Sequence, residues 1–420
     1  MNKKKLDIRS WLRKLGPGLV TGAADDDPSG IATYSQAGAK FGYELGWTVV
    51  LTYPLMVAVQ MISARLGRVT GRGLADNIRK NFPAPVLYAV VIMLLVANTI
   101  NVAADLAAMG QSLQLVVGGS SQVYAVLFGL ASLALEIYLP YRRYVNYLKW
   151  LTLVLFAYVA VALVADIAWS KALSGMLWPN AIPSADMLTV IVAVFGTTIS
   201  PYLFFWQAAQ EVEEVVANPK AHALKQSPSQ ARSQFRRINI DTYLGMGLSN
   251  SIALFIMIAT AATLYQAGVG DIQTSAQAAE ALRPIAGPFA FLLFSLGIVG
   301  TGMLAIPVLT GSAAYAVAET FGWRRGLDRK LREARRFYAI IAFATLGGAA
   351  LTLSPIDPIR ALFWSAVING VISVPVLIVM MLLAGNAKVM GPFVADRPLK
   401  VVGWLATLVM AAAVCAMFAT

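Results

Sequence analysis

Long apolar runs constrain this chain more than any other feature. Runs of about 17–25 residues, the length that crosses a bilayer as a helix, recur over all 420 residues. Hydrophobic residues make up 58% of the chain and charged residues 13%, which is too apolar for an ordinary soluble domain. Backbone polar groups in hydrocarbon must be satisfied within the segment, so the runs predict helices. We expect an all-α polytopic membrane protein with eleven spans, at residues 17–38, 44–64, 84–112, 122–139, 150–169, 187–210, 239–264, 286–316, 337–353, 359–384 and 400–419.

The Lys and Arg residues alternate with these spans. If the N-terminus is cytoplasmic, the segments on that side contain all of the 33 Lys and Arg residues except Lys40, Lys171, Arg283 and Arg360. This is the positive-inside pattern, so the net charge of +12 reflects membrane topology and does not indicate a nucleic-acid partner. We expect an integral protein of the bacterial inner membrane, surrounded by lipid, with residues 1–16 as a cytoplasmic segment. The oligomeric state is left open.

The first span carries three consecutive acids, Asp25, Asp26 and Asp27, followed by Pro28. Each aspartate at the centre of a membrane helix costs roughly 2.5–3.5 kcal/mol, so a plain lipid-facing helix does not fit. Pro28 cannot donate a hydrogen bond to the carbonyl oxygen of Ala24, so the helix is expected to break there. Asp27 either only caps the half-helix that follows, a position that suits Asp, or also belongs to a site.

The sixth span contains a second group of residues that disturb a helix. They are Gly196, Thr197, Thr198, Ser200 and Pro201, and the proline frees the carbonyl oxygen of Thr197. Irregular backbone at membrane depth is tolerated only where it is buried in protein or lines a cavity. Two such breaks therefore favour a binding site between them.

The spacing of the two breaks predicts an internal repeat. Spans one and six stand five helices apart, and an odd number of helices per half gives two repeats of opposite orientation. We expect a first inverted repeat over residues 17–170, a second over 187–384, and an added eleventh helix over 399–420. In such transporters the substrate binds near the bilayer midplane, where the broken helices meet.

The donors near the two breaks are all oxygen atoms. They are the carboxylates of Asp27 and its neighbours Asp25 and Asp26, the carbonyl oxygens near Ala24 and Thr197, and the hydroxyl groups of Thr197, Thr198 and Ser200. Neither break contains Met, Cys or His, and soft or borderline metals prefer those side chains. The donor set favours Mg²⁺ as the transported substrate, with Mn²⁺ as its chemical mimic, and it also suits Na⁺. No resident cofactor is expected.

The stretch DPSGIATYSQAGAKFGYELGW and the following QMISARLGRVTGRGLADNIRK resemble the NRAMP family of divalent-metal transporters. That family has Asp-Pro-Gly-Asn in a broken first helix, a similar ATxxQAGAxFGYxLLW run and an SARLGxVTGxxLA stretch. The resemblance implies a LeuT-type fold of two inverted five-helix repeats plus an eleventh helix. It also implies transport by alternating access.

This chain departs from the family at positions that the resemblance connects with the metal. Gly30 stands where the family has its metal-binding Asn, and the family's Met-Pro-His in the sixth helix is Ser200-Pro201-Tyr202 here. Thr197 stands where the family has a small residue ahead of that motif. The family's Met is a soft ligand that favours transition metals over Mg²⁺, and this chain lacks it.

Residues that the resemblance connects with proton movement also differ. The motif histidine is Tyr202, and a second histidine five positions on is Gln207. The family's Asp-Leu-Ala-Glu in the third helix reads Asp-Leu-Ala-Ala in this chain. Asp105 therefore keeps the first acid, and Ala108 replaces the Glu. Tyr, Gln and Ala do not relay protons near neutral pH as His and Glu do. The pattern resembles the NRAMP-related magnesium transporter branch, in which proton coupling is weak or absent.

Further polar residues lie within the expected spans. Asn369 lies within one or two positions of the place where the family presents an amide side chain to the metal. Asn98, Asn101 and Asp105 share one helix face and either line an aqueous path or bond to a neighbouring helix. Glu136 is expected to be structural. The acids Glu211, Glu213 and Glu214 either collect cations at the cytoplasmic mouth or pair with loop arginines.

We therefore expect a secondary transporter that imports divalent cations, Mg²⁺ first and Mn²⁺ also, with weak or no proton coupling. The alternative is a proton-coupled Mn²⁺/Fe²⁺ symporter, with Asp27, Asp26 or Asp105 carrying the proton. A Na⁺-coupled carrier of an anionic organic solute is disfavoured, because the three aspartates would repel it. No ATP-binding loop or nucleophile arrangement is present in the sequence, so an enzyme is not expected.

Overall fold

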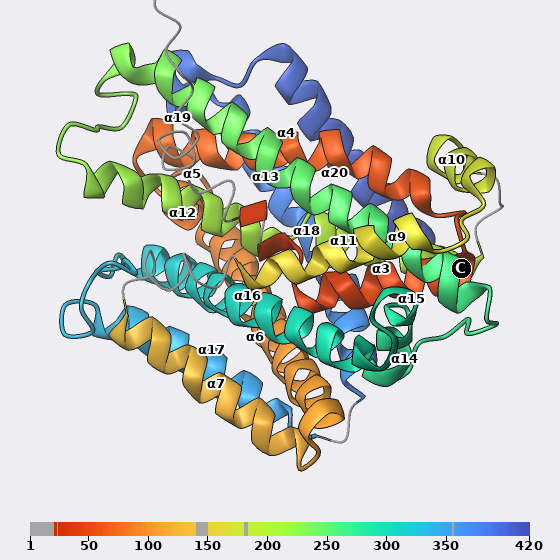
Figure 1. The fold of residues 1–420 in the computed structure, drawn as a ribbon. Helices are drawn as coiled ribbons and strands as arrows, with labels where there is room; N and C mark the ends of the chain where they lie inside the picture. Colours follow the sequence, from red (N-terminus) through yellow and green to blue (C-terminus); the bar gives the residue numbers. More distant parts are fainter. Residues whose placement is uncertain (1–20, 23, 140–149, 180–183, 355–356) are drawn as a thin grey trace, which may run out of the picture.

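The structure is a computed structural model that describes residues 21–22, 24–139, 150–179, 184–354 and 357–420. Every regular element in these residues is helical (Figure 1). Eight helices among them are long and apolar enough to cross a membrane, and Leu151–Val164 is a shorter apolar helix. The predicted N-terminal segment 1–16 lies outside the described residues.

The long helices follow the predicted spans, with ends that differ by up to eight residues. The helices are α3 (Pro28–Phe41), α4 (Gly46–Thr70), α5 (Leu74–Asn81), α6 (Ala84–Val117), α7 (Ser121–Tyr138), α9 (Phe156–Val164), α10 (Trp169–Leu177), α11 (Ala185–Thr198), α12 (Pro201–Ala217), α13 (Ala231–Thr260), α14 (Ser275–Glu280), α15 (Arg283–Ala286), α16 (Ala290–Phe321), α17 (Arg335–Leu351), α18 (Pro358–Gly385), α19 (Ala387–Met390) and α20 (Arg397–Ala419). A π-helical turn, Ala261–Tyr265, extends α13.

The first break is placed as the sequence predicts. Residues 24 and 25 are helical, Asp26 and Asp27 are not, and α3 begins at Pro28. A proline at the first helical position fits, because the amide hydrogen that it lacks would have no partner within the helix.

The second break is narrower than the sequence predicts. The helix α11 continues through Gly196, Thr197 and Thr198, and only Ile199 and Ser200 separate it from α12. The amide of Ile199 still donates to the carbonyl oxygen of Phe195 at 2.8 Å, so the helical bonding persists up to that residue. Small and β-branched residues in the last turn did not end the helix, whereas Pro201 did.

The short helix α3 lies inside the protein, packed against α11, α13 and α18. All of its residues from Pro28 to Ala39 are buried. Gly38 permits a close approach to α13, because a Cβ there would collide with Thr260 Oγ1 and the carbonyl oxygen of Met257. The helices α6 and α16 pack along each other, and α7 and α17 lie outside them at one side of the molecule (Figure 1).

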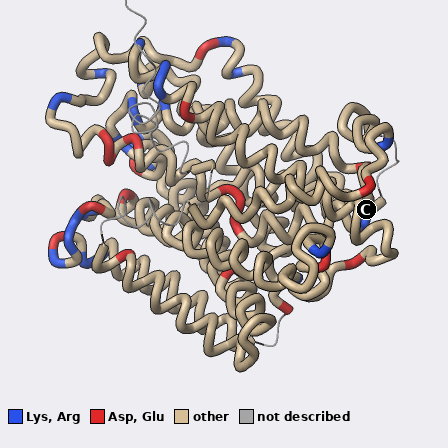
Figure 2. Tube along the Cα trace, viewed as in Figure 1, with Lys and Arg blue, Asp and Glu red and all other residues tan. Residues whose placement is uncertain are grey.

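The charged residues gather at one end of the molecule. Figure 2 shows most Lys and Arg at the end that carries α5, α19 and the segment after α16, with few at the opposite end. The acids Asp25–Asp27 lie in between, within the apolar interior. This distribution fits the positive-inside rule, and we refer to the basic end as the cytoplasmic end.

Candidate metal site between the broken helices

The two carboxylate oxygens of Asp27 have different partners. Asp27 is the N-cap of α3, and its Oδ1 accepts a hydrogen bond from the amide of Gly30 at 2.7 Å. Its Oδ2 accepts hydrogen bonds from Asn101 Nδ2 and from the Tyr202 hydroxyl, both at 3.2 Å. The capping interpretation is therefore correct but incomplete, because the second oxygen faces side chains of α6 and α12.

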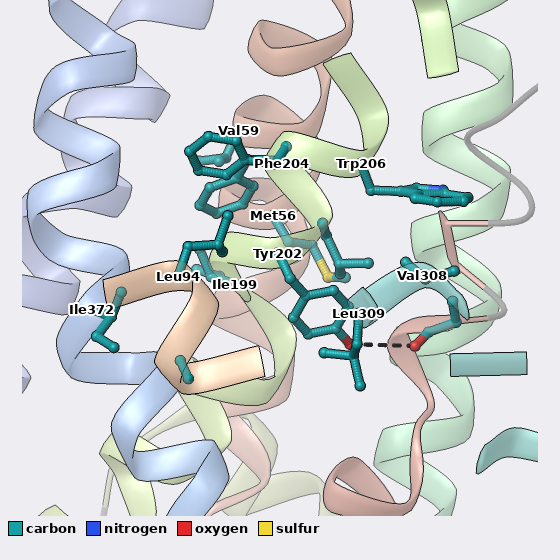
Figure 3. Packing of buried hydrophobic residues seen from close by; sticks show 14 of the residues in the cluster. Met56, Val59, Leu94, Ile199, Tyr202, Phe204, Trp206, Val308, Leu309 and Ile372 are labelled. Atoms are coloured by element: carbon teal, nitrogen blue, oxygen red, sulfur yellow. Dashed lines mark hydrogen bonds between the residues drawn. The ribbon is translucent and has the colours of Figure 1, made fainter. Parts of the chain in front are cut away.

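Tyr202 lies between the two breaks. Besides Asp27, its hydroxyl can donate to the carbonyl oxygen of Ala24 at 3.4 Å, which is one of the oxygens that Pro28 leaves free. Figure 3 shows the Tyr202 ring projecting from α12 toward Leu309, with Met56 nearby. The ring is 1% exposed. An apolar surrounding of this kind strengthens electrostatic interactions with the Asp27 carboxylate.

The carbonyl oxygens at the second break receive a side-chain donor. Ser200 Oγ lies 2.7 Å from the carbonyl oxygen of Gly196 and 2.8 Å from that of Thr197. The Thr197 side chain lies close to α3, because a Cβ on Gly30 would be 3.1 Å from Thr197 Oγ1. The structure thus brings the predicted residues Gly30, Thr197 and Ser200 to the same region as Asp27.

Three polar side chains near this region have atoms without a hydrogen-bond partner among the described residues. Asp105 is fully buried on α6, and neither carboxylate oxygen has a hydrogen-bond partner among the described residues. The same holds for both amide atoms of Asn369 on α18, which is 1% exposed, and for Asn101 Oδ1. Buried polar groups are rarely left unpaired, so these atoms have spare capacity for an ion or for water.

Of the two alternatives for the polar face of α6, hydrogen bonding to a neighbouring helix is seen for Asn98 and Asn101, and an aqueous path stays a prediction. Asn98 bonds across to α16, where it donates to the carbonyl oxygen of Leu309 and to Ser312 Oγ, both at 2.8 Å. Asn101 instead reaches Asp27. Asn101 was missing from the predicted site residues, although its spacing from Asp105 on one helix face was the signal that could have included it.

Asp25 and Asp26 are directed to a different helix from Asp27. Both accept hydrogen bonds from Ser249 Oγ on α13, Asp25 through Oδ2 at 2.5 Å and Asp26 through Oδ1 at 3.1 Å. They attach the first broken helix to α13. The described residues contain no group of three or more His, Cys, Asp or Glu side chains that could hold a metal ion. Of the three consecutive aspartates, Asp27 is the one whose carboxylate contacts α6 and α12.

Contacts close the site toward the cytoplasmic end. Thr21 Oγ1 and Gln207 Oε1 lie 2.6 Å apart and join the first broken helix to α12. Further along α12, Glu211 and Glu214 both form ion pairs with Arg237 of α13, Glu211 at 2.5 Å and Glu214 at 3.4 Å. Of the two alternatives predicted for the acids here, pairing with an arginine is seen for Glu211 and Glu214. We call Thr21, Gln207, Glu211 and Arg237 the cytoplasmic gate.

Contacts also close the site toward the opposite end. Gln36 of α3 donates to Asp271 Oδ1 at 2.6 Å and accepts from the amide of Ile272 at 2.9 Å. Lys40 forms an ion pair with Asp186 at 2.9 Å. Asp27 is only 1% exposed, so the described residues shield it from solvent.

The comparisons with known proteins agree on the family. The profile of the family described as natural resistance-associated macrophage protein-like matches residues 18–420. The divalent metal cation transporter MntH of Yersinia enterocolitica is 28% identical over 414 residues, which cover 96% of this chain and 93% of that protein. The protein of the same name from Burkholderia ambifaria is 27% identical over 421 residues, with 97% and 88% covered.

Solved structures show the same fold. The manganese transporter of Eremococcus coleocola superposes with a TM-score of 0.73 at 19% identity, covering 99% of this chain and 89% of that one. A Na⁺-coupled sialic acid symporter superposes with a TM-score of 0.61 at 12% identity, covering 94% and 87%. The predicted all-α, LeuT-type fold is confirmed, as is an integral membrane protein with many spans. The family match covers nearly the whole length, so the chain belongs to the natural resistance-associated macrophage protein (NRAMP) family of membrane transporters.

Proposed function

We propose that this protein carries divalent metal cations across a bacterial inner membrane, and that the ion binds at Asp27. The observation that carries the proposal is the lack of a charged partner at the Asp27 carboxylate oxygen Oδ2. Oδ2 is buried between the two breaks, and its partners, Asn101 and Tyr202, carry no charge. A divalent ion would supply the charge that this carboxylate lacks, and a buried carboxylate is costly without such a partner. The relatives' names, divalent metal cation transporter and manganese transporter, support the same function.

We propose Mn²⁺ and Mg²⁺ as transported ions. Mn²⁺ follows from the manganese transporter of the same fold. Mg²⁺ rests on the chemistry of this chain's donors, namely the Asp27 carboxylate, the hydroxyl groups of Thr197 and Ser200, the Ala24 carbonyl oxygen and the amide of Asn369. All offer hard oxygen atoms, and one carboxylate leaves room for the waters that Mg²⁺ retains. In this respect the chain resembles the magnesium branch of the family.

We further propose that transport needs little or no proton movement. The side chains at the two positions that resemble proton-linked histidines are Tyr202 and Gln207, and neither titrates near neutral pH. A cytoplasm-negative potential contributes about 2.3 kcal/mol per charge per 100 mV, hence about 4.6 kcal/mol for a divalent ion. Uptake driven by voltage alone is therefore feasible. The repeats over residues 17–170 and 187–384 would move relative to each other as the two ends open in turn.

One observation favours a second candidate, a proton-coupled Mn²⁺/Fe²⁺ symporter. Asp105 is a fully buried acid without a partner among the described residues, as a proton carrier in a membrane helix would be. The curated relatives also carry the general name of divalent metal cation transporters and not that of magnesium transporters. Coupling is therefore the property to measure together with ion identity.

The test is ion uptake into proteoliposomes that contain a Mg²⁺- or Mn²⁺-sensitive dye and a pH dye. We expect uptake of both ions that follows the imposed voltage, leaves internal pH unchanged and disappears in Asp27→Ala. Glu333→Gln, which changes an exposed acid far from the breaks, serves as the matched control and keeps full activity. Mn²⁺ uptake with acidification and without Mg²⁺ uptake would establish the symporter instead. No uptake of either ion by the intact protein would contradict both.

A further inference from the structure

A pocket of about 320 Å³ opens at the cytoplasmic end, away from the metal site. Three segments that are distant in sequence form it, namely the turn from α4 into α5, the segment before α13, and α19. Its volume lies at the lower end of the range of about 300–1,000 Å³ that is usual for small-molecule sites. Figure 1 shows α5 and α19 near each other at this end.

The lining of this pocket is strongly basic. Arg72, Lys80, Lys225 and Lys388 line it, and no Asp or Glu does. Arg72 has only a distant partner, Asp76 at 3.8 Å, and Asp76 also pairs with Arg79 at 2.7 Å. Such a pocket repels the divalent cation that the metal site attracts. A basic surface is expected at a cytoplasmic end, but topology alone does not require four cations around one cavity.

The wall of the pocket is fixed by hydrogen bonds. Asn77 is 2% exposed, and its Nδ2 donates to Thr70 Oγ1 and to the carbonyl oxygens of Arg72 and Gly73, at 2.9–3.0 Å. The amide of Lys225 donates to the carbonyl oxygen of Val69 at the end of α4. The cavity is therefore pre-formed, which lowers the entropy that ligand binding would otherwise lose.

The lysines divide into one that holds the pocket together and two that are free. Lys225 Nζ donates to the carbonyl oxygens of Lys388 and Val389, at 3.1 and 3.2 Å, which attaches α19 to the segment before α13. An ammonium group has three donors, so one remains. Lys80 and Lys388 are exposed and have no ion pair within the described part of the chain. Their charges are available to a ligand.

We propose that this pocket binds a phosphate-bearing anion. A phosphate group offers several charged acceptor oxygens to the ammonium and guanidinium donors, and Lys and Arg are the usual residues for it. The source is either the headgroup of an anionic phospholipid or a soluble phosphorylated compound, because the pocket lies at the cytoplasmic end where both are present. Bound there, the anion links the turn from α4 into α5, the segment before α13, and α19, and stabilises their arrangement.

The experiment measures thermal unfolding of the full chain in nanodiscs, with EDTA present so that no divalent ion interferes. Inorganic pyrophosphate is titrated into phosphatidylcholine nanodiscs, and nanodiscs with added phosphatidylglycerol are compared in parallel. The pocket variant combines Lys80→Gln with Lys388→Gln. The control combines Lys330→Gln with Arg332→Gln, which removes the same charge from exposed residues outside the pocket on the same end.

We expect pyrophosphate to stabilise the intact protein and the control, and to bind the pocket variant about 25-fold more weakly. Stabilisation by phosphatidylglycerol but not by pyrophosphate, lost only in the pocket variant, would identify the lipid as the source. Equal responses of the two variants, or no response of the intact protein to either anion, would overturn the proposal. If the double variant fails to fold, Lys80→Glu alone gives the same comparison.

Discussion

The hydroxyl group of Tyr202 lies 3.2 Å from Asp27 Oδ2 and 3.4 Å from the carbonyl oxygen of Ala24. One side chain of α12 thus contacts both the carboxylate and the free carbonyl of the first broken helix. These are two of the oxygens that the proposed ion would use. An ion that binds there must displace the tyrosine hydroxyl or share these oxygens with it.

Tyr202→Phe removes the competing hydroxyl with little change of shape. A hydrogen bond to a charged group contributes roughly 1.5–3 kcal/mol, part of which the ion must overcome. We expect the Mn²⁺ concentration for half-maximal uptake to fall by about three- to tenfold, measured in proteoliposomes at fixed voltage. A rise would show that the tyrosine oxygen is itself a ligand of the ion.

Ser200→Met tests the origin of ion choice. The thioether is a soft donor that prefers transition metals, so the ratio of Mn²⁺ to Mg²⁺ uptake should rise by about tenfold or more. Ser200→Ala is the control, since it removes the same hydroxyl from the carbonyl oxygens of Gly196 and Thr197 without adding sulfur. If both variants change the ratio equally, the lost hydroxyl is responsible and the sulfur is not.

The helices and the first break could be predicted because each rests on a strong local signal. Apolar length gives the spans, and Pro28 directly after three acids gives the break and its cap. The extent of the second break could not be predicted in the same way. Gly196 and Thr198 weaken a helix in isolation, but packing against α18 holds them in it, and a Cβ at Gly196 would collide with the carbonyl oxygen of Ala366.

The direction of side chains across the interior was also beyond the sequence. Asp26 and Asp27 are neighbours, yet one contacts Ser249 on α13 and the other contacts Asn101 on α6. Which acid faces the site depends on the backbone conformation at the break, and composition does not predict that conformation. The place of Asp27 directly before Pro28 singled it out, and the predicted site residues did not include Asn101.

Asp105→Asn distinguishes the two proposed transport modes. The substitution keeps the side-chain shape and removes a buried, unpaired acid, so we expect uptake within about threefold of the intact protein and equal or higher thermal stability. Uptake, internal pH and the unfolding midpoint are measured on the same preparation. Loss of Mn²⁺ uptake together with loss of acidification would assign the proton to Asp105.

Glu136 on α7 has a structural role that can be tested separately. Its Oε2 accepts a hydrogen bond from Thr310 Oγ1 of α16 at 3.0 Å, and the residue is 2% exposed. Glu136→Gln retains an acceptor for the Thr310 hydroxyl group and should keep the unfolding midpoint. Glu136→Ala removes that acceptor and leaves a cavity, so it should lower the free energy of unfolding by about 1–3 kcal/mol. Ion affinity should be the same in both folded variants. A change of ion affinity in Glu136→Gln would contradict a purely structural role.

The cytoplasmic gate gives a prediction about conformation. Arg237→Gln leaves the buried Glu211 and the half-buried Glu214 without this ion-pair partner, and two neighbouring acids repel each other, so the cytoplasmic end should open more often. In a Cys415→Ser background, Thr21→Cys reports the opening through its rate of labelling by a charged thiol reagent. We expect the labelling rate to rise by about tenfold, which corresponds to a decrease of about 1.4 kcal/mol in the free energy of opening.

Arg236→Gln is the matched control for this measurement. Arg236 is adjacent in sequence and exposed, and it has no ion pair within the residues that the structure describes. Removing it changes the net charge equally but should leave the labelling rate unchanged. Added Mn²⁺ should lower the rate in the Arg237→Gln protein, since an ion bound at Asp27 between the broken helices favours the occluded state. Equal labelling of the two variants would show that the ion pair does not keep the cytoplasmic end closed, and that closure depends on the apolar packing of α12 instead.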